Sequence, residues 1–131
     1  MKYALQYQGN LRTEIIHLKS NTKIITDAPV DNKGKGESFS PTDLTAVSLA
    51  SCMITIMGIK AQENNINIIG TTAEADKIML SNPRRIGEII VKIKLPENLS
   101  EKERKILMKS ALTCPVALSL HPDIKQTVLF V

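Results

Sequence analysis

Two cysteines, Cys52 and Cys114, are the residues of this chain best suited to nucleophilic or redox chemistry. Sixty-one residues lie between them, so they do not form the closely spaced pair typical of zinc sites and thioredoxin-like motifs. The two histidines, His17 and His121, are also far from metal-ligand spacing, and we therefore expect neither a metal nor a cofactor. In a reducing compartment a permanent disulfide is not expected. The two thiols are then either inert core residues or a redox pair.

A long helix predicted over residues 41–63 carries the first of these cysteines. Ser40 has the residue type of an N-cap, Pro41 suits the first helical position, and Asp43 completes a capping box. From residue 46 to residue 59 the helix is apolar nearly all the way round, a pattern typical of a helix buried on every side. We expect this helix to form the core of the fold.

A narrow polar stripe surrounds Cys52 on the predicted helix. Thr45, Ser48, Cys52 and Thr55 follow at spacings of three, four and three residues. At ~100° per residue this places the four side chains within roughly 80° of the helix circumference. Two interpretations fit the spacing equally well. The hydroxyls bond to carbonyls one turn earlier beside an inert thiol, or the stripe lines a pocket with a thiol at its centre.

A reactive thiolate at Cys52 requires a cation from another part of the fold. Cys52 lies about three turns from the positive end of its helix, beyond the reach of the helix dipole, and apolar burial raises the pKa of a thiol. An arginine on a strand is the natural supplier, because it is always charged and can donate forked hydrogen bonds. Cys114 differs, since it directly precedes Pro115 and is expected at the N-terminus of a short helical segment. That position favours a thiolate.

The remaining segments predict a single α+β domain, residues 1–131, in which an antiparallel sheet packs on two helices. A second capping box, from Ser100 to Glu103, opens an amphipathic helix that Pro115 interrupts, and residues 27–39 predict a polar loop. Alternating apolar residues predict strands over residues 2–8, 12–19, 22–26, 66–79, 87–95 and 126–131. In the predicted strand over residues 87–95, the apolar face consists of Ile89, Val91, Ile93 and Leu95.

Composition and charge exclude several classes of protein. Hydrophobic residues make up 43% and charged residues 23% of the 131 positions, which is ordinary for a globular chain. No apolar run reaches the ~18 residues of a membrane span, and no signal-peptide pattern is present, so we expect a cytoplasmic protein without a membrane partner. The net charge is +4, and its basic excess over residues 76–109 is interrupted by acids. With only 3% aromatic residues, we do not expect nucleic-acid binding.

Several segments resemble the OsmC/Ohr family of organic hydroperoxide reductases. They are FSPTDL at residues 39–44, ASCM at residues 50–53 and CPV at residues 114–116, and PRR at residues 83–85 before a strand also fits. The resemblance implies the OsmC-like fold, an intertwined homodimer in which antiparallel sheets wrap two central helices. It also implies active sites at the dimer interface.

The same resemblance implies a role for three residues. Cys52 matches the peroxidatic cysteine, whose thiolate attacks the peroxide and becomes a sulfenic acid. Cys114 matches the resolving cysteine, which condenses with that sulfenic acid to form a disulfide. A dithiol reductant, either a dihydrolipoyl protein or a thioredoxin-like protein, then restores both thiols. Arg12 matches the arginine that stabilises the thiolate.

One position departs from the family pattern. Relatives with established peroxidase chemistry place a glutamate ten residues before the cysteine to orient the arginine, and this chain has Thr42 there. The candidate acidic partners are Glu37 in the polar loop and Asp43, although we expect Asp43 to serve in the capping box.

Two hypotheses follow from these observations. In the first, the protein is a thiol-dependent peroxidase that reduces organic hydroperoxides, with hydrogen peroxide as a further candidate substrate. In the second, it is an apolar-ligand-binding or redox-sensing protein of the same fold, without peroxidase turnover.

Overall fold

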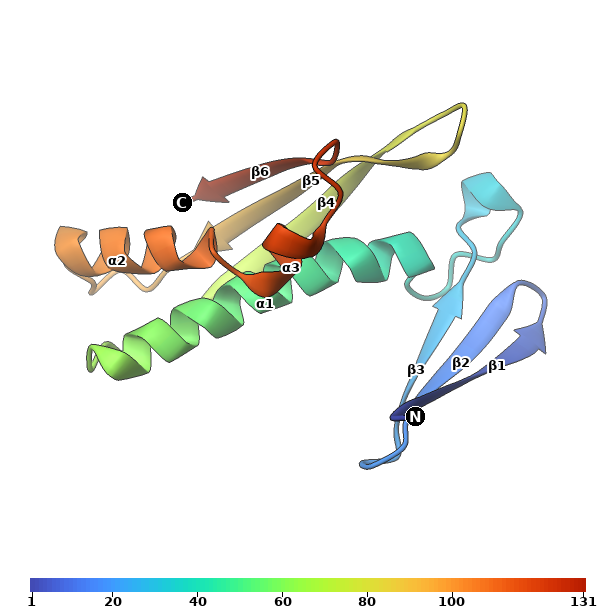
Figure 1. Ribbon diagram of the computed structural model, residues 1–131, viewed down its shortest axis with the longest axis horizontal. Helices are drawn as coiled ribbons and strands as arrows, with labels where there is room; N and C mark the ends of the chain where they lie inside the picture. The colour runs from blue at the N-terminus through green and yellow to red at the C-terminus, as the bar shows by residue number, and fades with distance from the viewer. The chain divides into compact units, whose positions relative to one another are not determined.

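Three short strands organise the N-terminal part of the chain: β1 (Tyr3–Gly9), β2 (Arg12–His17) and β3 (Thr22–Asp27). They form an antiparallel sheet in the order β1-β2-β3 (Figure 1). The two turns that join these strands each contain an asparagine at positive φ, Asn10 and Asn21, a conformation that asparagine tolerates well. The computed structural model describes residues 1–131 and forms two compact units, Met1–Leu44 and Thr45–Val131. The three strands belong to the first unit.

The segment after β3 folds back onto that strand. It contains a short 3-10 helix, η1 (Val30–Asn32), and its far end is tied to β3 by a hydrogen bond from the Asp27 N–H to the Phe39 carbonyl, at 2.9 Å. Gly34 permits the fold-back, because a Cβ there would lie 1.6 Å from the Ala28 carbonyl oxygen. The prediction that placed Asp27 in a polar loop is wrong: Asp27 is the last residue of β3 and is buried.

The predicted long helix and its cap are confirmed. Helix α1 spans Pro41–Glu63. The Ser40 hydroxyl accepts a hydrogen bond from the Asp43 N–H at 3.0 Å, and the Asp43 carboxylate accepts one from the Ser40 N–H at 2.8 Å. Together these two bonds form a reciprocal capping box, which satisfies amide groups that the first turn of a helix leaves without partners.

Only one face of α1 is buried, so the prediction of burial on every side is wrong for the single chain. Val47 and Ile59 remain 40% and 50% exposed on its other side. By length and composition alone α1 could also cross a membrane, a test that core helices pass equally. The buried α1 residues of the core are Ala46, Leu49, Ala50, Met53, Met57 and Ala61.

The second unit contains a three-stranded sheet in the order β4-β5-β6, made of β4 (Thr72–Leu80), β5 (Arg85–Lys94) and β6 (Lys125–Phe130). β4 and β5 pair antiparallel, whereas β5 and β6 pair parallel, so the expected antiparallel sheet is in fact mixed. The helical segments between β5 and β6 provide the long crossover that a parallel return requires. The predicted inner face of β5 is confirmed, since Ile89, Val91, Ile93 and the following Leu95 are all buried.

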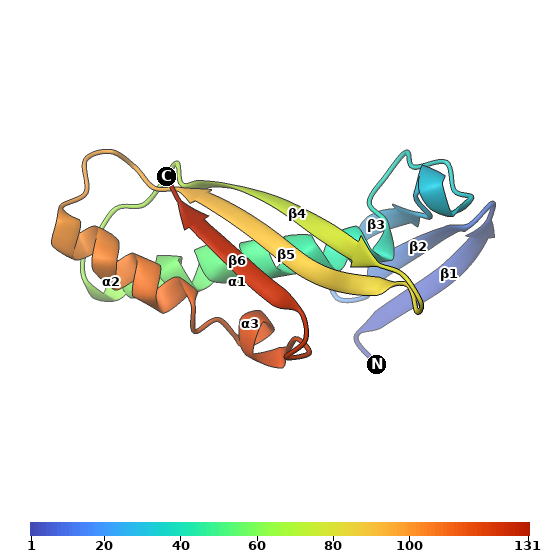
Figure 2. The same ribbon diagram turned by 90° about the horizontal axis from the view of Figure 1, so that it is seen from above.

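Two further helices complete this unit: α2 (Glu101–Ala111) and the short α3 (Pro115–Ser119). The predicted capping box between Ser100 and Glu103 is present at the start of α2. α1 and α2 lie on the same face of the β4-β5-β6 sheet (Figures 1 and 2), and their buried residues form one core cluster with the inner face of β5. Cys114 belongs to this core cluster, and Cys52 packs against it.

Replacement of Asp43 by alanine should lower the free energy of unfolding by about 1 kcal/mol, because the Ser40 N–H loses its acceptor. Denaturant-induced unfolding measures this change. Glu101→Ala is a suitable control, since Glu101 is also an acidic residue in the first turn of a helix but lies outside the capping box. Equal losses in the two variants would contradict a specific capping role for Asp43.

Candidate functional site

The two cysteines, far apart in sequence, meet in the second unit. Cys52 lies on α1 and is partly exposed, while Cys114 is fully buried at the N-cap of α3. Both are free thiols, and the Cys52 side chain is close enough to Cys114 to affect its ionisation. The Cys114 sulfur also accepts a hydrogen bond from the Ala117 N–H at 3.3 Å. The arrangement therefore joins a more accessible thiol to a fully enclosed one.

Burial raises the pKa of the Cys114 thiol above its ordinary value. The neighbouring Cys52 side chain raises the pKa of Cys114 further, whereas the hydrogen bond from the Ala117 N–H opposes the shift. The expectation that the start of a helix would favour a Cys114 thiolate is therefore wrong, because desolvation outweighs the helix N–H groups. The raised pKa keeps Cys114 protonated at neutral pH.

The polar stripe around Cys52 supports local hydrogen bonding on the helix. The Ser48 hydroxyl donates to the Thr45 carbonyl at 2.7 Å, and the Thr55 hydroxyl donates to the Ser51 carbonyl at 2.8 Å. The interpretation in which hydroxyls bond back to helix carbonyls is thus confirmed for these two residues. Cys52 itself packs against the core cluster.

Arg12, on β2 in the first unit, is held by two carboxylates. Its Nε donates to Asp27 Oδ1 at 2.7 Å, and its Nη2 donates to Asp27 Oδ2 at 2.9 Å and to Glu37 Oε2 at 3.0 Å. Of the two candidate acidic partners, Glu37 therefore contacts the arginine, whereas the Asp43 carboxylate is engaged in the cap of α1. The most extensive partner of Arg12 is Asp27, which the sequence analysis did not propose.

Charge pairing controls the ionisation of this cluster. The hydrogen bond from Arg12 is the largest cause of a lowered pKa at Asp27, and it outweighs the opposing effect of burial. The same hydrogen bond, followed by the one to Glu37, raises the pKa of Arg12. Asp27 stays ionised although its side chain is only 1% exposed.

The register of β2 and β3 could have identified Asp27 as the partner of Arg12 from the sequence. The turn at residues 20 and 21 pairs His17 with Thr22, and counting outward along the two strands from that pair places Arg12 directly opposite Asp27. Opposite charges at facing positions of an antiparallel pair attract each other.

Neither histidine contributes to either cluster. His17 is exposed and its Nδ1 lies 2.6 Å from the Ser20 hydroxyl, while the exposed His121 accepts a hydrogen bond from the Asp123 N–H. The structure contains no group of three or more His, Cys, Asp or Glu side chains that could hold a metal ion.

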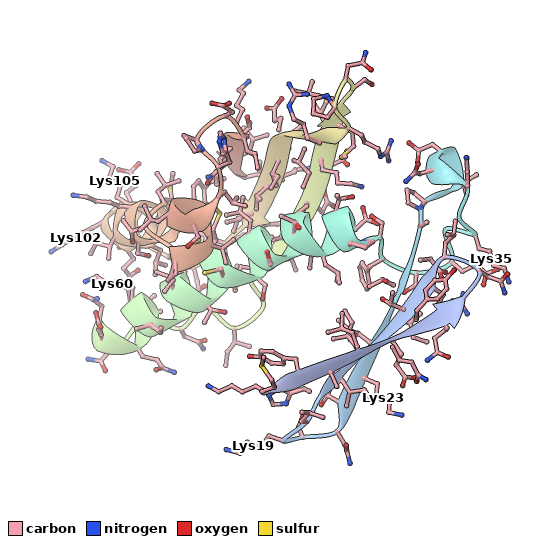
Figure 3. All side chains as sticks on the ribbon, turned by 45° about the vertical axis from the view of Figure 1, so that its right-hand side comes forward. Lys19, Lys23, Lys35, Lys60, Lys102 and Lys105 are labelled. Carbon is pink, nitrogen blue, oxygen red and sulfur yellow. The ribbon has the colours of Figure 1, made fainter.

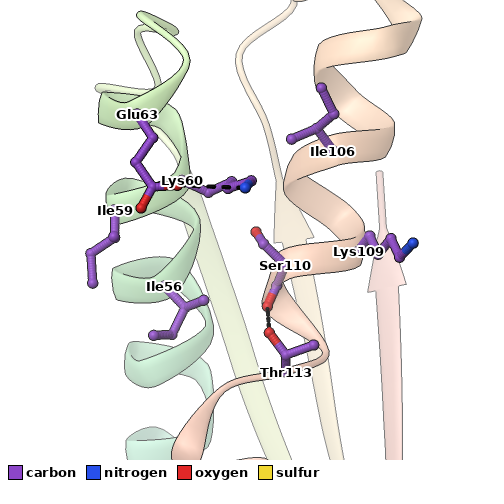
Figure 4. A pocket seen from close by; sticks show the side chains of 8 residues that line it. All are labelled: Ile56, Ile59, Lys60, Glu63, Ile106, Lys109, Ser110 and Thr113. Carbon is purple, nitrogen blue, oxygen red and sulfur yellow. Dashed lines mark hydrogen bonds and ion pairs between the residues drawn. The ribbon is translucent and has the colours of Figure 1, made fainter.

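A groove of about 510 Å³ lies between α1 and α2 (Figure 4). One end of it is formed by Ile56, one turn after Cys52, and by Thr113, which precedes Cys114. The groove therefore begins near the thiol pair. Its other apolar lining residues are Ile59 and Ile106, and Lys60 within it pairs with Glu63 at 3.5 Å.

The surface that carries lysines from α1 and α2 also carries acidic residues, so it does not form a continuous basic patch. Lys60, Lys102 and Lys105 gather at one end of α1 and α2 (Figure 3). Glu101 and Glu103 are interspersed with them at the start of α2. A surface of alternating charges is typical of a solvated face.

Alkylation by iodoacetamide at pH 7 to 8 should modify Cys52 well before Cys114. The raised pKa lowers the thiolate fraction of Cys114 at any pH below that pKa, and its full burial hinders the reagent. Intact mass and peptide mapping over time measure the two rates. Equal labelling of Cys114 in folded protein would contradict this description of the pair.

Comparison with known proteins identifies the family. A family model described as "OsmC-like protein" matches residues 34–128. A protein from Psychrobacter arcticus 273-4, whose assignment to the osmotic stress and detoxification response is itself provisional, is 57% identical. Its crystal structure aligns over 100% of this chain and 96% of its own, with a TM-score of 0.95.

More distant structures share the fold. An organic hydroperoxide resistance protein OsmC from Legionella pneumophila is 14% identical, with 99% of this chain and 96% of that chain covered and a TM-score of 0.77. An OsmC-like protein from Mycoplasma pneumoniae is 18% identical, with coverages of 98% and 94% and a TM-score of 0.78. No match was found among curated proteins. The extent of the family match and the 57% identity over the full chain show that this protein belongs to the OsmC family and has its α+β fold.

Proposed function

We propose that this protein is a thiol-dependent peroxidase that reduces organic hydroperoxides. The observation that carries the proposal is the proximity of the Cys52 and Cys114 side chains, which pairs a partly exposed thiol with a buried one whose pKa is raised. Membership in a family that includes organic hydroperoxide resistance proteins supports it. Two free thiols that are neighbours in the fold are the arrangement that a disulfide-forming cycle requires.

The proposed reaction proceeds in two steps on the protein. The Cys52 thiolate attacks the distal peroxide oxygen, the O–O bond breaks, and the alkoxide leaves as the alcohol after it takes up a proton, so that Cys52 becomes a sulfenic acid. The Cys114 thiol then attacks the Cys52 sulfur, the hydroxyl leaves as water, and a disulfide forms. A dithiol reductant regenerates both thiols by exchange and is itself oxidised to a disulfide.

Arg12 supplies the cation in this proposal. An arginine can hydrogen-bond a thiolate and a peroxide oxygen with different N–H groups of the same planar fork. Glu37 is one acidic partner of that arginine. The isoleucines of the groove between α1 and α2 favour hydroperoxides with an apolar body over hydrogen peroxide.

We also propose that the protein acts as a homodimer with its active sites at the interface, since OsmC/Ohr proteins are generally homodimers. An apolar row crosses the N-terminal sheet, where Leu5 faces Ile15 and Ile15 faces Ile24. Leu5 is 67% and Ile24 is 43% exposed in the single chain. Exposed apolar surface of this kind marks protein–protein contacts.

One equivalent of cumene hydroperoxide should consume both thiols of the reduced protein and lower its mass by about 2 Da, the two hydrogens lost on disulfide formation. Cys52→Ser should abolish peroxide consumption, whereas Cys114→Ser should complete a single turnover and retain a sulfenic acid. Thiol counting and intact-mass measurement follow the oxidation of the wild-type protein and of both variants. Thiols that remain unchanged over minutes would favour the ligand-binding alternative, in which Thr42 in place of the glutamate prevents turnover.

Analytical ultracentrifugation should give twice the chain mass of 14.4 kDa. Leu5→Lys should shift the protein toward the monomer, because it places a charge in the exposed apolar row. Gln6→Lys is the matched control, since neighbouring residues of a strand point to opposite faces. A wild-type protein that is monomeric at micromolar concentration would contradict the proposed interface.

A further inference from the structure

We propose that Asp27 is the positioning residue of Arg12, and that it leaves the Nη1 amino group of the guanidinium as the donor for the reacting sulfur or peroxide. This inference rests on the proposed peroxidase function and assigns to Asp27 the orienting role for which the position of Thr42 offers no acid. Asp27 differs from the two acidic partners proposed from the sequence, which were Glu37 and Asp43.

Counting donors shows which edge of Arg12 remains available. A guanidinium has five N–H groups: one on Nε and two on each terminal nitrogen. Asp27 accepts from Nε and from Nη2, and Glu37 accepts from Nη2 as well, so the Nε–Nη2 edge is fully used. Nη1 makes no hydrogen bond in the structure, and its two N–H groups can therefore bind an incoming anion.

The contacts of Asp27 fix the plane of the guanidinium. One carboxylate oxygen, Oδ1, accepts from Arg12 Nε, while Oδ2 accepts both from Arg12 Nη2 and from the Glu37 N–H at 3.1 Å. Rotation of the carboxylate would break three bonds at once. Bidentate pairing of this type fixes orientation as well as distance, and a point contact to one nitrogen would not do so.

Burial distinguishes Asp27 from Glu37. The Asp27 side chain is 1% exposed, whereas that of Glu37 is 64% exposed. An exposed ion pair is screened by solvent and readily exchanged, but a buried carboxylate that loses its cation is left without compensation. Asp27 is thus the permanent anchor of Arg12, and Glu37 is the partner that can be displaced.

Charge balance also favours an orienting role. The positive charge of the half-buried Arg12 is offset by the buried Asp27 and by the exposed Glu37, so the cluster contributes directed N–H donors more than an overall positive field. Donors held in place act on developing charge without having to reorganise during the reaction. The specific geometry of arginine should therefore matter more than its charge.

A double-mutant cycle in the Cys114→Ser background tests this, with Cys52 as the only thiol. Asp27→Asn and Arg12→Ala should each slow the oxidation of Cys52 by cumene hydroperoxide by about 10-fold or more, and Asp27→Asn should add less than about 2-fold in the Arg12→Ala protein. Such non-additivity is expected only if Asp27 acts through Arg12. Additive losses would overturn the proposal.

Alkylation of Cys52 by iodoacetamide as a function of pH provides a readout that does not need peroxidase activity. Both single variants should move the midpoint to higher pH, and the double variant should move it no further. If wild-type protein fails to react with hydroperoxide but shows this pattern, the peroxidase function fails and the role of Asp27 stands. An unchanged midpoint in Asp27→Asn would overturn that role.

Arg12→Lys tests the same point even if Asp27→Asn fails to fold. Lysine keeps the charge but cannot hold Asp27 bidentately and present a second donor edge. The rate of Cys52 oxidation should therefore fall about as far as in Arg12→Ala, by ~10-fold or more, and a near wild-type rate would overturn the proposal. Glu14→Gln is the matched control, because it removes a partly exposed ion pair with Lys23 between the same two strands.

Discussion

The packing of one face of α1 against the β4-β5-β6 sheet and α2 is the constraint on which the thiol pair depends. The buried α1 residues recur with helical spacing, so packing them fixes the rotation of the helix as well as its position. Cys52 lies at the edge of that buried face and is therefore neither enclosed by the core nor directed fully into solvent. The end of α2 is anchored in the same core by Leu107 and Ala111, and the chain then brings Cys114 to α1. A thiol on a loop would lack this fixed relation to its partner.

Burial also gives the two sulfurs different roles. Two thiols in equivalent surroundings would compete for the same proton, whereas full desolvation of Cys114 keeps the proton on that residue. The N–H groups at the N-terminus of α3 lower the pKa of Cys114. However, α3 has only five residues, and this effect does not outweigh the loss of water around the thiol. The more accessible sulfur is then suited to meet a substrate, and the enclosed one to respond afterwards. This order matches the sequence of steps that a two-cysteine reduction requires.

Local signals in the sequence predicted the elements, and long-range pairing limited what could be predicted of the site. Both capping boxes, the length of α1 and the inner face of β5 follow from residue types and periodicity alone, and the structure confirms them. Periodicity could not show that only one face of α1 is buried by its own chain, because an apolar face has the same sequence pattern whether the same chain or another covers it. The parallel pairing of β6 with β5 could not be predicted from the sequence either, since strand direction depends on the path of the crossover. The raised pKa of Cys114 depends on burial by residues distant in sequence, which its position before Pro115 does not reveal.

The absence of a glutamate at position 42 need not leave Arg12 without an orienting acid. What the arginine requires is a carboxylate at a fixed position, and any backbone segment that reaches the guanidinium can provide it. Antiparallel pairing of β2 and β3 brings Asp27 opposite Arg12, and the fold-back after β3 adds the Glu37 N–H as a third bond to the carboxylate. The buried carboxylate of Asp27 in turn ties that segment to the sheet, so the same contacts that would orient the arginine also stabilise the surrounding backbone. Asp27 is held by strand pairing and by the Glu37 N–H, whereas position 42, in the first turn of α1, carries a threonine that cannot pair with a cation.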